Sequence, residues 1–355
     1  SRSAPEHAGP QKKNMSERPI HHSPQTVAEA LAYDTNCSVT DYILGITFEI
    51  WEEGQVDRIL QYYSEDCPVY GLDGITRGAA QMVEQTHATL KAFPDRLLIG
   101  DDVIWAGTVS HGFSSHRVLS PMTNLGDTAF GPATGRTVRV MNMADCEITN
   151  GQISREWLVR DNLALVRQLG FDPVESARSL AAGFDNELTA WLRQEYTRVA
   201  GSPSAPEIST GPGSSADDAE MARRVLTNCW LEGNRRQLES VYAPYSVMHR
   251  APLRIHSGRD EILAHYDAWR RVLPDAQISI DHVCSQPFGE DGRHIAVRWG
   301  IAGTQQDAFS GCAASGQRLF ILGVTHWRVL AGRIISEWTV FDELALMAQS
   351  LGANG

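Results

Sequence analysis

Two seven-residue stretches carry the side chains best suited to proton transfer. The first is EWLVRDN, residues 156–162, and the second is EWTVFDE, residues 337–343. Each places an Asp four residues after a Trp on a predicted strand, so alternation puts both on one face. A carboxyl group in an apolar pocket has a raised pKa and can move protons. Alternatively, each Asp caps the next helix or pairs with an Arg. The residues concerned are Trp157, Asp161, Trp338 and Asp342.

A His-Arg pair in the middle of another predicted strand is a second candidate for chemistry. His116 and Arg117 lie in SSHRV, and the matching positions later in the chain are Val297 and Arg298. His titrates near neutral pH, and Arg can hold an oxyanion or orient a carboxylate. Adjacent strand residues face opposite sides, so at most one of each pair points fully inward. A surface Arg and a hydrogen-bonded structural His are the alternative.

Further polar and aromatic residues could line a pocket. Asn142 and Asp145 lie on the strand VMNMADCEI and face opposite sides, so either one could be inside. Arg155 shares the face of Asp161 by alternation and could neutralise it. Tyr70 and His249 occupy equivalent places on a short strand and could bind a substrate oxygen, or simply contribute to packing.

The remaining histidines give little indication of a metal site. His87 falls on the apolar face of its predicted helix, where a structural role competes with a functional one. His265, His282 and His326 fit no metal-binding spacing, and the chain has no HExxH, Walker or GxSxG motif. We therefore expect no metal and no cofactor.

Composition narrows the class of protein. The chain has 355 residues, 42% hydrophobic and 21% charged, and a net charge of −12. Because the net charge is negative, we do not expect electrostatic binding to nucleic acid. No apolar run is long enough to cross a bilayer. The six cysteines are scattered, and the N-terminus lacks an apolar signal region, so we expect a cytoplasmic protein with free thiols.

The sequence contains an internal duplication. Trp51 matches Trp230, Pro94 matches Pro274 and Asp161 matches Asp342, at offsets of 179, 180 and 181. A repeat of this length indicates duplicated domains. We predict a disordered segment at 1–34, a first domain with a helical extension at 35–200, a linker at 201–216 and a second domain at 217–355.

Each copy begins with helical periodicity and ends with strand periodicity. In the first copy the expected helices include 78–93, and the expected strands are 96–105, 110–119, 136–149 and 153–161. Helices followed by an antiparallel sheet indicate an α+β fold.

The ordered motifs resemble the SnoaL-like polyketide cyclases of the nuclear transport factor 2-like superfamily. They include RGAAQMVEQTHATLKAFPD and NGQISREWLVRDN in the first copy, and SGRDEILAHYDAWRRVLPD and AGRIISEWTVFDELALMAQSLG in the second. The resemblance covers about 37–172 and 220–352. It implies two tandem cones, each a curved antiparallel sheet wrapped on about three helices around a deep pocket.

The resemblance also implies an activity. In SnoaL-like cyclases the Asp matched by Asp161 and Asp342 is the acid/base, and relatives often dimerise through the open sheet face. Limonene epoxide hydrolase has an Asp two residues after its Arg; Leu119 and Gly300 stand there in this chain, which argues against epoxide hydrolysis.

Two function classes follow from these residues. One is a cofactor-independent acid/base enzyme, a cyclase, isomerase or lyase, acting on a small apolar substrate with a carbonyl or hydroxyl group. Asp161 would move the proton, with His116 or Arg117 assisting, inside a wall that includes Trp105, Phe113 and Trp157. The other is a non-catalytic binding or scaffold protein. A homodimer is a further expectation.

Overall fold

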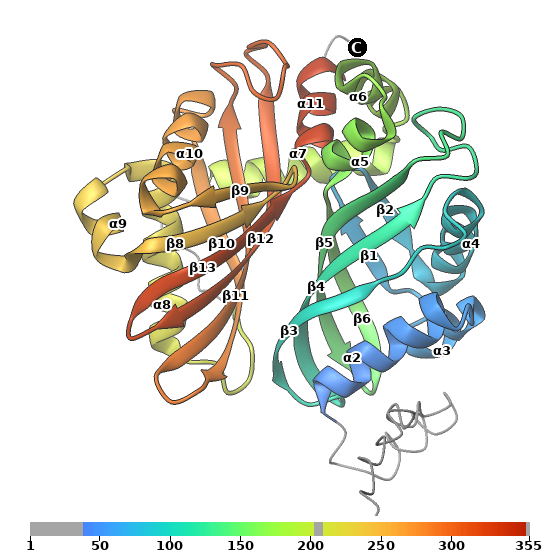
Figure 1. Cartoon of the computed structure of the whole chain (residues 1–355), viewed down its shortest axis with the longest axis horizontal. Coiled ribbons are helices and arrows are strands. Elements are labelled where there is room, and N and C mark those ends of the chain that lie inside the picture. Colours follow the sequence, from blue (N-terminus) through green and yellow to red (C-terminus); the bar gives the residue numbers. More distant parts are fainter. Residues whose placement is uncertain (1–37, 202–208, 353–355) are drawn as a thin grey trace, which may run out of the picture.

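The structure, a computed structural model, describes residues 38–201 and 209–352. The predicted disordered segment 1–34 and part of the predicted linker lie outside these described residues. The described chain forms two halves whose curved sheets face each other, with α2–α4 on one flank and α8–α10 on the other (Figure 1). This is the tandem α+β arrangement that the repeat and the motifs predict.

The first half contains a six-stranded sheet in the order β2-β1-β6-β5-β4-β3. All neighbouring strands are antiparallel except β1 and β6. Its elements are α2 (Val39–Thr47), η1 (Phe48–Glu52), η2 (Val56–Arg58), α3 (Ile59–Tyr62), β1 (Pro68–Gly71), β2 (Gly74–Arg77), α4 (Gly78–Ala92), β3 (Ile99–Gly107), β4 (His111–Thr123), β5 (Thr137–Thr149), β6 (Gln152–Arg160) and α5 (Asn162–Leu169).

Local sequence signals account for the first helix. Ser38 accepts the Asp41 N–H at 3.0 Å and so satisfies a donor that the start of α2 leaves free. Ile43 and Ile46 are buried, as their helical spacing predicts. Gly54 ends the helical segment with φ of +69°, a left-handed conformation that glycine adopts without strain.

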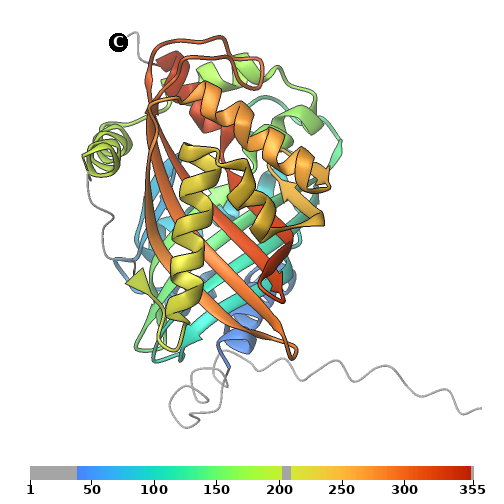
Figure 2. The same cartoon turned by 90° about the vertical axis from the view of Figure 1, so that its left-hand side faces the viewer.

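The second half repeats this order. Its sheet runs β7-β10-β11-β12-β13-β8-β9, and Figure 2 shows α8 and α10 on its outer side. The elements are β7 (Ser209–Thr210), α8 (Ala216–Thr227), η3 (Asn228–Glu232), α9 (Arg235–Val241), β8 (Tyr242–Arg250), β9 (Arg254–Ser257), α10 (Arg259–Val272), β10 (Gln277–Phe288), β11 (Gly292–Thr304), β12 (Arg318–Leu330), β13 (Arg333–Phe341) and α11 (Glu343–Gly352).

The strand registers of the two sheets correspond. His116 pairs with Ala144 across β4 and β5, and Val297 pairs with Thr325 across β11 and β12. Both residues of the second pair lie 181 positions after their counterparts (297 − 116 and 325 − 144). The duplication therefore extends to individual strand pairs, and residues in the two halves can be compared position by position.

Two reciprocal contacts join the halves. The Arg117 guanidinium carbon lies 3.8 Å from the centre of the Trp338 ring, and that of Arg298 lies 3.3 Å from the Trp157 ring. In the first contact the Arg belongs to the first half and the Trp to the second, and in the second contact this is reversed, as in a symmetric dimer interface. The two sheets thus pair within one chain. Any homodimer would use a further surface, and it stays a prediction.

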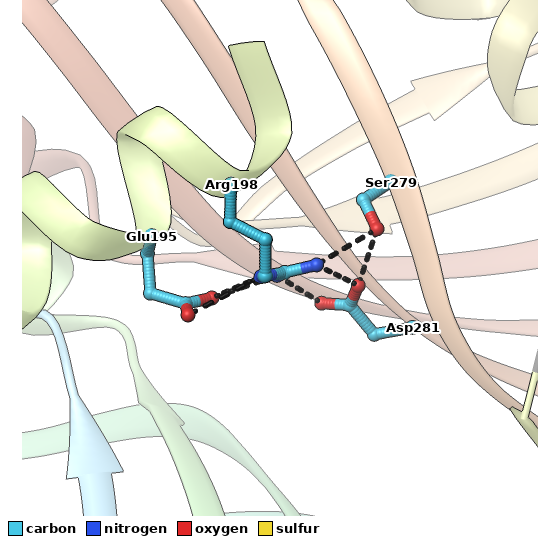
Figure 3. Close-up of polar contacts among 4 residues, drawn as sticks. All are labelled: Glu195, Arg198, Ser279 and Asp281. Atoms are coloured by element: carbon cyan, nitrogen blue, oxygen red, sulfur yellow. Dashed lines mark hydrogen bonds and ion pairs between the residues drawn. The ribbon is translucent and has the colours of Figure 1, made fainter. Parts of the chain in front are cut away.

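The helical extension crosses from one half to the other. The extension comprises α6 (Pro173–Ala182), which packs on α11, and α7 (Asn186–Ala200), which packs on β11 and β12. Figure 3 shows Arg198 of α7 between Glu195 and Asp281. Its Nη1 also donates to Ser279 Oγ at 3.1 Å. These contacts hold the end of the first copy against the second sheet.

Candidate functional site

The first half contains a cavity of about 200 Å³ between its helices and the inner face of its sheet. Apolar residues of α2, η1 and the strands form about half of its wall. Polar groups from α4, β4, β5, β6 and the loop after α4 form much of the rest. The polar groups used below are Arg96, His116, Asn142, Glu156 and Arg160.

Aromatic side chains occupy the corresponding space in the second half. The ring centres of Trp230 and Trp299 lie 5.1 Å apart, as do those of Trp269 and Phe341. Gly323 makes room for this cluster, because a Cβ there would lie 2.2 Å from the Trp299 ring. In the first half smaller or polar residues stand at these positions: Thr86 for Tyr266, Thr89 for Trp269, Val118 for Trp299, Asn142 for Gly323, Cys146 for Trp327 and Arg160 for Phe341.

The face of β6 that lines the cavity is not the predicted one. Ile153, Glu156 and Arg160 point into the cavity, whereas Trp157 lies on the opposite face, against the second half. The cause is a β-bulge: Ile153 pairs with Ile148 and Arg155 with Glu147, so Ser154 is an extra residue. Simple alternation from Ile153 therefore assigns the wrong face to every later residue of the strand.

Glu156 is the carboxyl group that faces this cavity. Its side chain is buried. Burial raises the pKa of the Glu156 carboxyl, while hydrogen bonds from Tyr63 and Cys146 and the charge of Arg160 act in the opposite direction. A carboxyl group in this state can hold or release a proton within the cavity. Glu156 was not among the residues predicted from the sequence, although the recurrence of the same residue type at Glu337 was visible there.

His116 faces the same cavity from β4. Its Nε2 atom is buried and has no hydrogen-bond partner among the described residues. Burial, followed by the nearby charge of Arg117, lowers the pKa of His116 to about 4. The imidazole is therefore neutral at pH 7, and its Nε2 lies in the wall of the cavity beside Gly100. His116, and not Arg117, is therefore the member of the His-Arg pair that points into this cavity.

Asp161 and Asp342 begin helices, as the alternative interpretation of each stretch anticipated. Asp161 Oδ1 accepts the Ala164 N–H at 3.1 Å, and its Oδ2 accepts the Leu253 N–H of the second half, also at 3.1 Å. Asp342 Oδ1 accepts the Ala345 N–H at 3.1 Å. Neither Asp lines the first cavity. Asp161 does line an adjoining one of about 320 Å³, so its acid/base role stays a prediction.

The pKa of Asp161 leads to a testable pH dependence. Burial raises this pKa to about 7, against 3.8 in an unfolded chain. Between these values the folded state keeps a proton that the unfolded state releases, so the Asp161 contribution to stability is full below pH 3.8 and is lost as pH rises through 7. Relative to Asp161→Asn, which keeps a capping oxygen, we expect the wild type to lose up to about 4 kcal/mol over this range.

Denaturant unfolding of both proteins from pH 4 to pH 8 measures this difference. Asp172→Asn is the matched control, because Asp172 also caps a helix but is exposed to solvent. A pH-independent difference between the wild type and Asp161→Asn would contradict the raised pKa.

The predicted Arg, Asp and Trp pocket residues meet at the contact between the halves instead of in the cavity. Arg298 donates to Asp145 Oδ2 at 2.8 Å, and Arg117 donates to Asp101 Oδ2 at 2.7 Å. Both guanidinium groups also lie over a Trp ring of the opposite half, Trp338 or Trp157. Five predicted site residues therefore build the domain interface: Arg117, Asp145, Trp157, Arg298 and Trp338.

Tyr70, His249 and Phe113 also lie outside the cavity. Tyr70 stacks on Trp157 at 6.1 Å between ring centres, and His249 stacks on Trp338 at 5.5 Å, which repeats the same contact in both halves. Phe113 lies 4.2 Å from the His282 ring of the second half. The expectation that these residues line the pocket of a single cone is thus wrong in its geometry.

The other predicted site residues have separate locations. Asn142 lines both cavities, and its Oδ1 accepts the Asp161 N–H at 3.3 Å. Trp105 packs against the core of the first half. His87 is on the surface, 3.7 Å from Asp57, so the expectation of a buried apolar face is wrong. Arg155 pairs with Glu147 at 3.7 Å and does not neutralise Asp161.

Two further features concern the described residues only. No group of three or more His, Cys, Asp or Glu side chains in 38–201 and 209–352 is placed to hold a metal ion. No described helix is long and apolar enough to cross a membrane.

Comparison with protein families agrees with the tandem organisation of the chain. The family model described as SnoaL-like polyketide cyclase matches residues 43–169 and 220–350, more than half of the chain. The chain therefore belongs to the SnoaL-like polyketide cyclase family, with two copies of the family domain. A search of curated proteins finds no match.

Several solved structures resemble one domain of the chain. A SnoaL-like polyketide cyclase from Agrobacterium tumefaciens is 17% identical, with 38% of this chain and 99% of that chain covered and a TM-score of 0.33. TsrD from Streptomyces laurentii is 18% identical, with 39% and 98% covered and a TM-score of 0.33. IdmH from Streptomyces antibioticus is 22% identical, with 37% and 96% covered and a TM-score of 0.31. Likeness at this level says nothing of a shared reaction.

Proposed function

We propose that the first half is a cofactor-independent acid/base enzyme of the SnoaL-like type. Its substrate is a small apolar molecule, aromatic or otherwise, with a carbonyl or hydroxyl group. The observation that carries this proposal is the first cavity, where a buried carboxyl group and a neutral imidazole, whose Nε2 has no hydrogen-bond partner among the described residues, belong to one wall. Proton abstraction next to a carbonyl group needs this combination of groups.

Within this site we assign the proton transfer to Glu156. Burial raises its pKa, so it can take a proton from carbon and return it to another atom of the substrate. In this proposal the Nε2 of His116, which has no hydrogen-bond partner among the described residues, donates to or accepts from the substrate oxygen, where negative charge develops during abstraction. Cyclisation, isomerisation and elimination all begin with this step.

The second half supports the first without chemistry of its own in this proposal. Its interior is occupied by the Trp299 aromatic cluster, and its Glu337 accepts hydrogen bonds from Tyr242 and Tyr266. It also covers the outer face of the first sheet through Arg298 and its contacts. The non-catalytic alternative therefore applies to this half.

Deuterium incorporation tests the proposal without knowledge of the natural substrate. The protein is incubated in D₂O with aryl ketones and β-keto esters, and mass spectrometry measures exchange at the carbon next to the carbonyl group. We expect catalysed exchange for compounds that bind the first half. Compounds that bind in the cavity, as shown by NMR, but exchange no faster than in buffer would oppose the proposal.

Filling the cavity in the manner of the second half should abolish this activity. The double variant Val118→Trp with Asn142→Gly reproduces the Trp299 and Gly323 pair. We expect it to fold, because the second copy already accommodates this pair. Its exchange rate should fall at least about 100-fold, because bound substrate can no longer approach Glu156. Circular dichroism and the same exchange assay measure both outcomes, and full activity in a folded variant would contradict the location of the site.

A further inference from the structure

One cation of the first cavity has no acidic partner. Arg96 lies in the loop between α4 and β3 and lines both the first cavity and the adjoining one. Its Nε donates to Ser120 Oγ at 3.0 Å, and its guanidinium carbon lies 4.6 Å from the centre of the Trp51 ring. Among the described residues, no carboxylate forms an ion pair with Arg96, and its two Nη groups have no hydrogen-bond partner.

Two other arginines of the first half, one buried and one half-buried, do have an acidic partner. Arg117 pairs with Asp101 at 2.7 Å, and Arg160, which shares the cavity wall with Arg96, pairs with Asp73 at 3.0 Å. Burial and the charge of Arg160 lower the pKa of Arg96 to about 10, so Arg96 is still charged at neutral pH. A half-buried charge without a partner is costly, and a bound anion would remove that cost.

The second copy provides an internal comparison. Ala276 follows Pro274 and Asp275 where Arg96 follows Pro94 and Asp95, and Phe341 stands at the position of Arg160. Both cations are thus absent from the half whose interior is filled by aromatic side chains. The shared fold does not require Arg96, because the second half has Ala276 in its place. Arg96 occurs only in the half that has the cavity.

We propose that Arg96 binds the carboxylate of an apolar, ring-containing ligand in the first cavity. Ser120 fixes Nε and Trp51 supports one face of the guanidinium, which leaves the two Nη groups to bind the two oxygens of a carboxylate. The apolar wall of the cavity holds the rings. This inference rests on the proposed function, because it names the class of substrate for that site, an aromatic or alicyclic acid.

Matched pairs of acids and amides test this binding. Benzoate, 2-naphthoate and anthracene-2-carboxylate are each compared with their primary amides, and isothermal titration or Trp fluorescence gives the dissociation constants. We expect the best-fitting acid to bind the wild type about 10- to 100-fold more tightly than its amide. In Arg96→Gln this advantage should disappear, while amide binding changes little. Arg96→Lys keeps the charge but not the planar fork, so part of the advantage should remain.

Controls separate a binding role from a folding role. Arg139→Gln removes an exposed arginine of β5 and should leave both constants unchanged. Unchanged amide binding in Arg96→Gln shows that the cavity is intact. Acids that bind no more tightly than amides, or an acid advantage that survives in Arg96→Gln, would overturn the inference. Because binding is measured without turnover, failure of the exchange assay and failure of this inference can be distinguished.

Discussion

Glu156→Gln should slow catalysed deuterium exchange about 10²- to 10⁴-fold, the range expected for loss of a general acid/base group. The amide has nearly the shape of the carboxyl group but cannot accept the proton. Substrate binding should change little, so the effect falls on kcat and not on KM. His116→Asn should also lower kcat, because it removes the ring nitrogen that faces the substrate oxygen.

A carboxylate on the other face of the sheet provides the control. Glu147 lies beside Cys146 on β5 and pairs with Arg155, away from the first cavity. Glu147→Gln should retain full activity. Asp161→Asn distinguishes the two candidate carboxyl groups: a loss of exchange in this variant, with Glu156→Gln unaffected, would move the proton transfer to the adjoining cavity.

The sequence predicted the architecture because the fold depends on patterns that occur twice. Three anchors at nearly constant offset defined the duplication, and Ile43 and Ile46 marked the buried face of the first helix. The predicted strand 136–149 differs by one residue at its start from β5, Thr137–Thr149. Such repeated periodicities are local properties, so they are readable without knowledge of tertiary contacts.

The site was harder to predict because strand alternation cannot tell which face is inside. Alternation placed Trp157 and Asp161 on the face of Ile153, but the bulge at Ser154 puts Ile153 on the face of Glu156 instead. Bulges depend on how two strands pair, which a single strand does not reveal. Ile335 is the extra residue at the matching place in β13.

The paired sheets add a second source of error. Each sheet of this chain has two buried faces, one toward its own helices and one toward the other half. Arg117 is buried and Trp338 half-buried on the second of these faces, where their residue types resemble those of a binding pocket. Only the contact between distant segments shows that they join two domains.

Glu337 and its equivalent in the first half, Glu156, should differ in how much they stabilise the fold. Glu337 is fully buried and accepts hydrogen bonds from Tyr242 and Tyr266, both at 2.5 Å, from Trp327 Nε1 at 3.1 Å and from Thr339 at 2.7 Å. Glu337→Gln replaces one acceptor oxygen with a donor NH₂ group, so donors face donors in a closed core. We expect a loss of about 3–5 kcal/mol in the free energy of unfolding.

Glu156→Gln is the matched variant at the equivalent position. Glu156 borders a cavity that has room for water, so its replacement should cost about 1 kcal/mol or less. Denaturant unfolding monitored by Trp fluorescence compares the two variants. A large loss in Glu337→Gln with a small loss in Glu156→Gln supports the division into a filled half and an open half. Equal losses would contradict it, because they would mean that both carboxyl groups hold the core together in the same way.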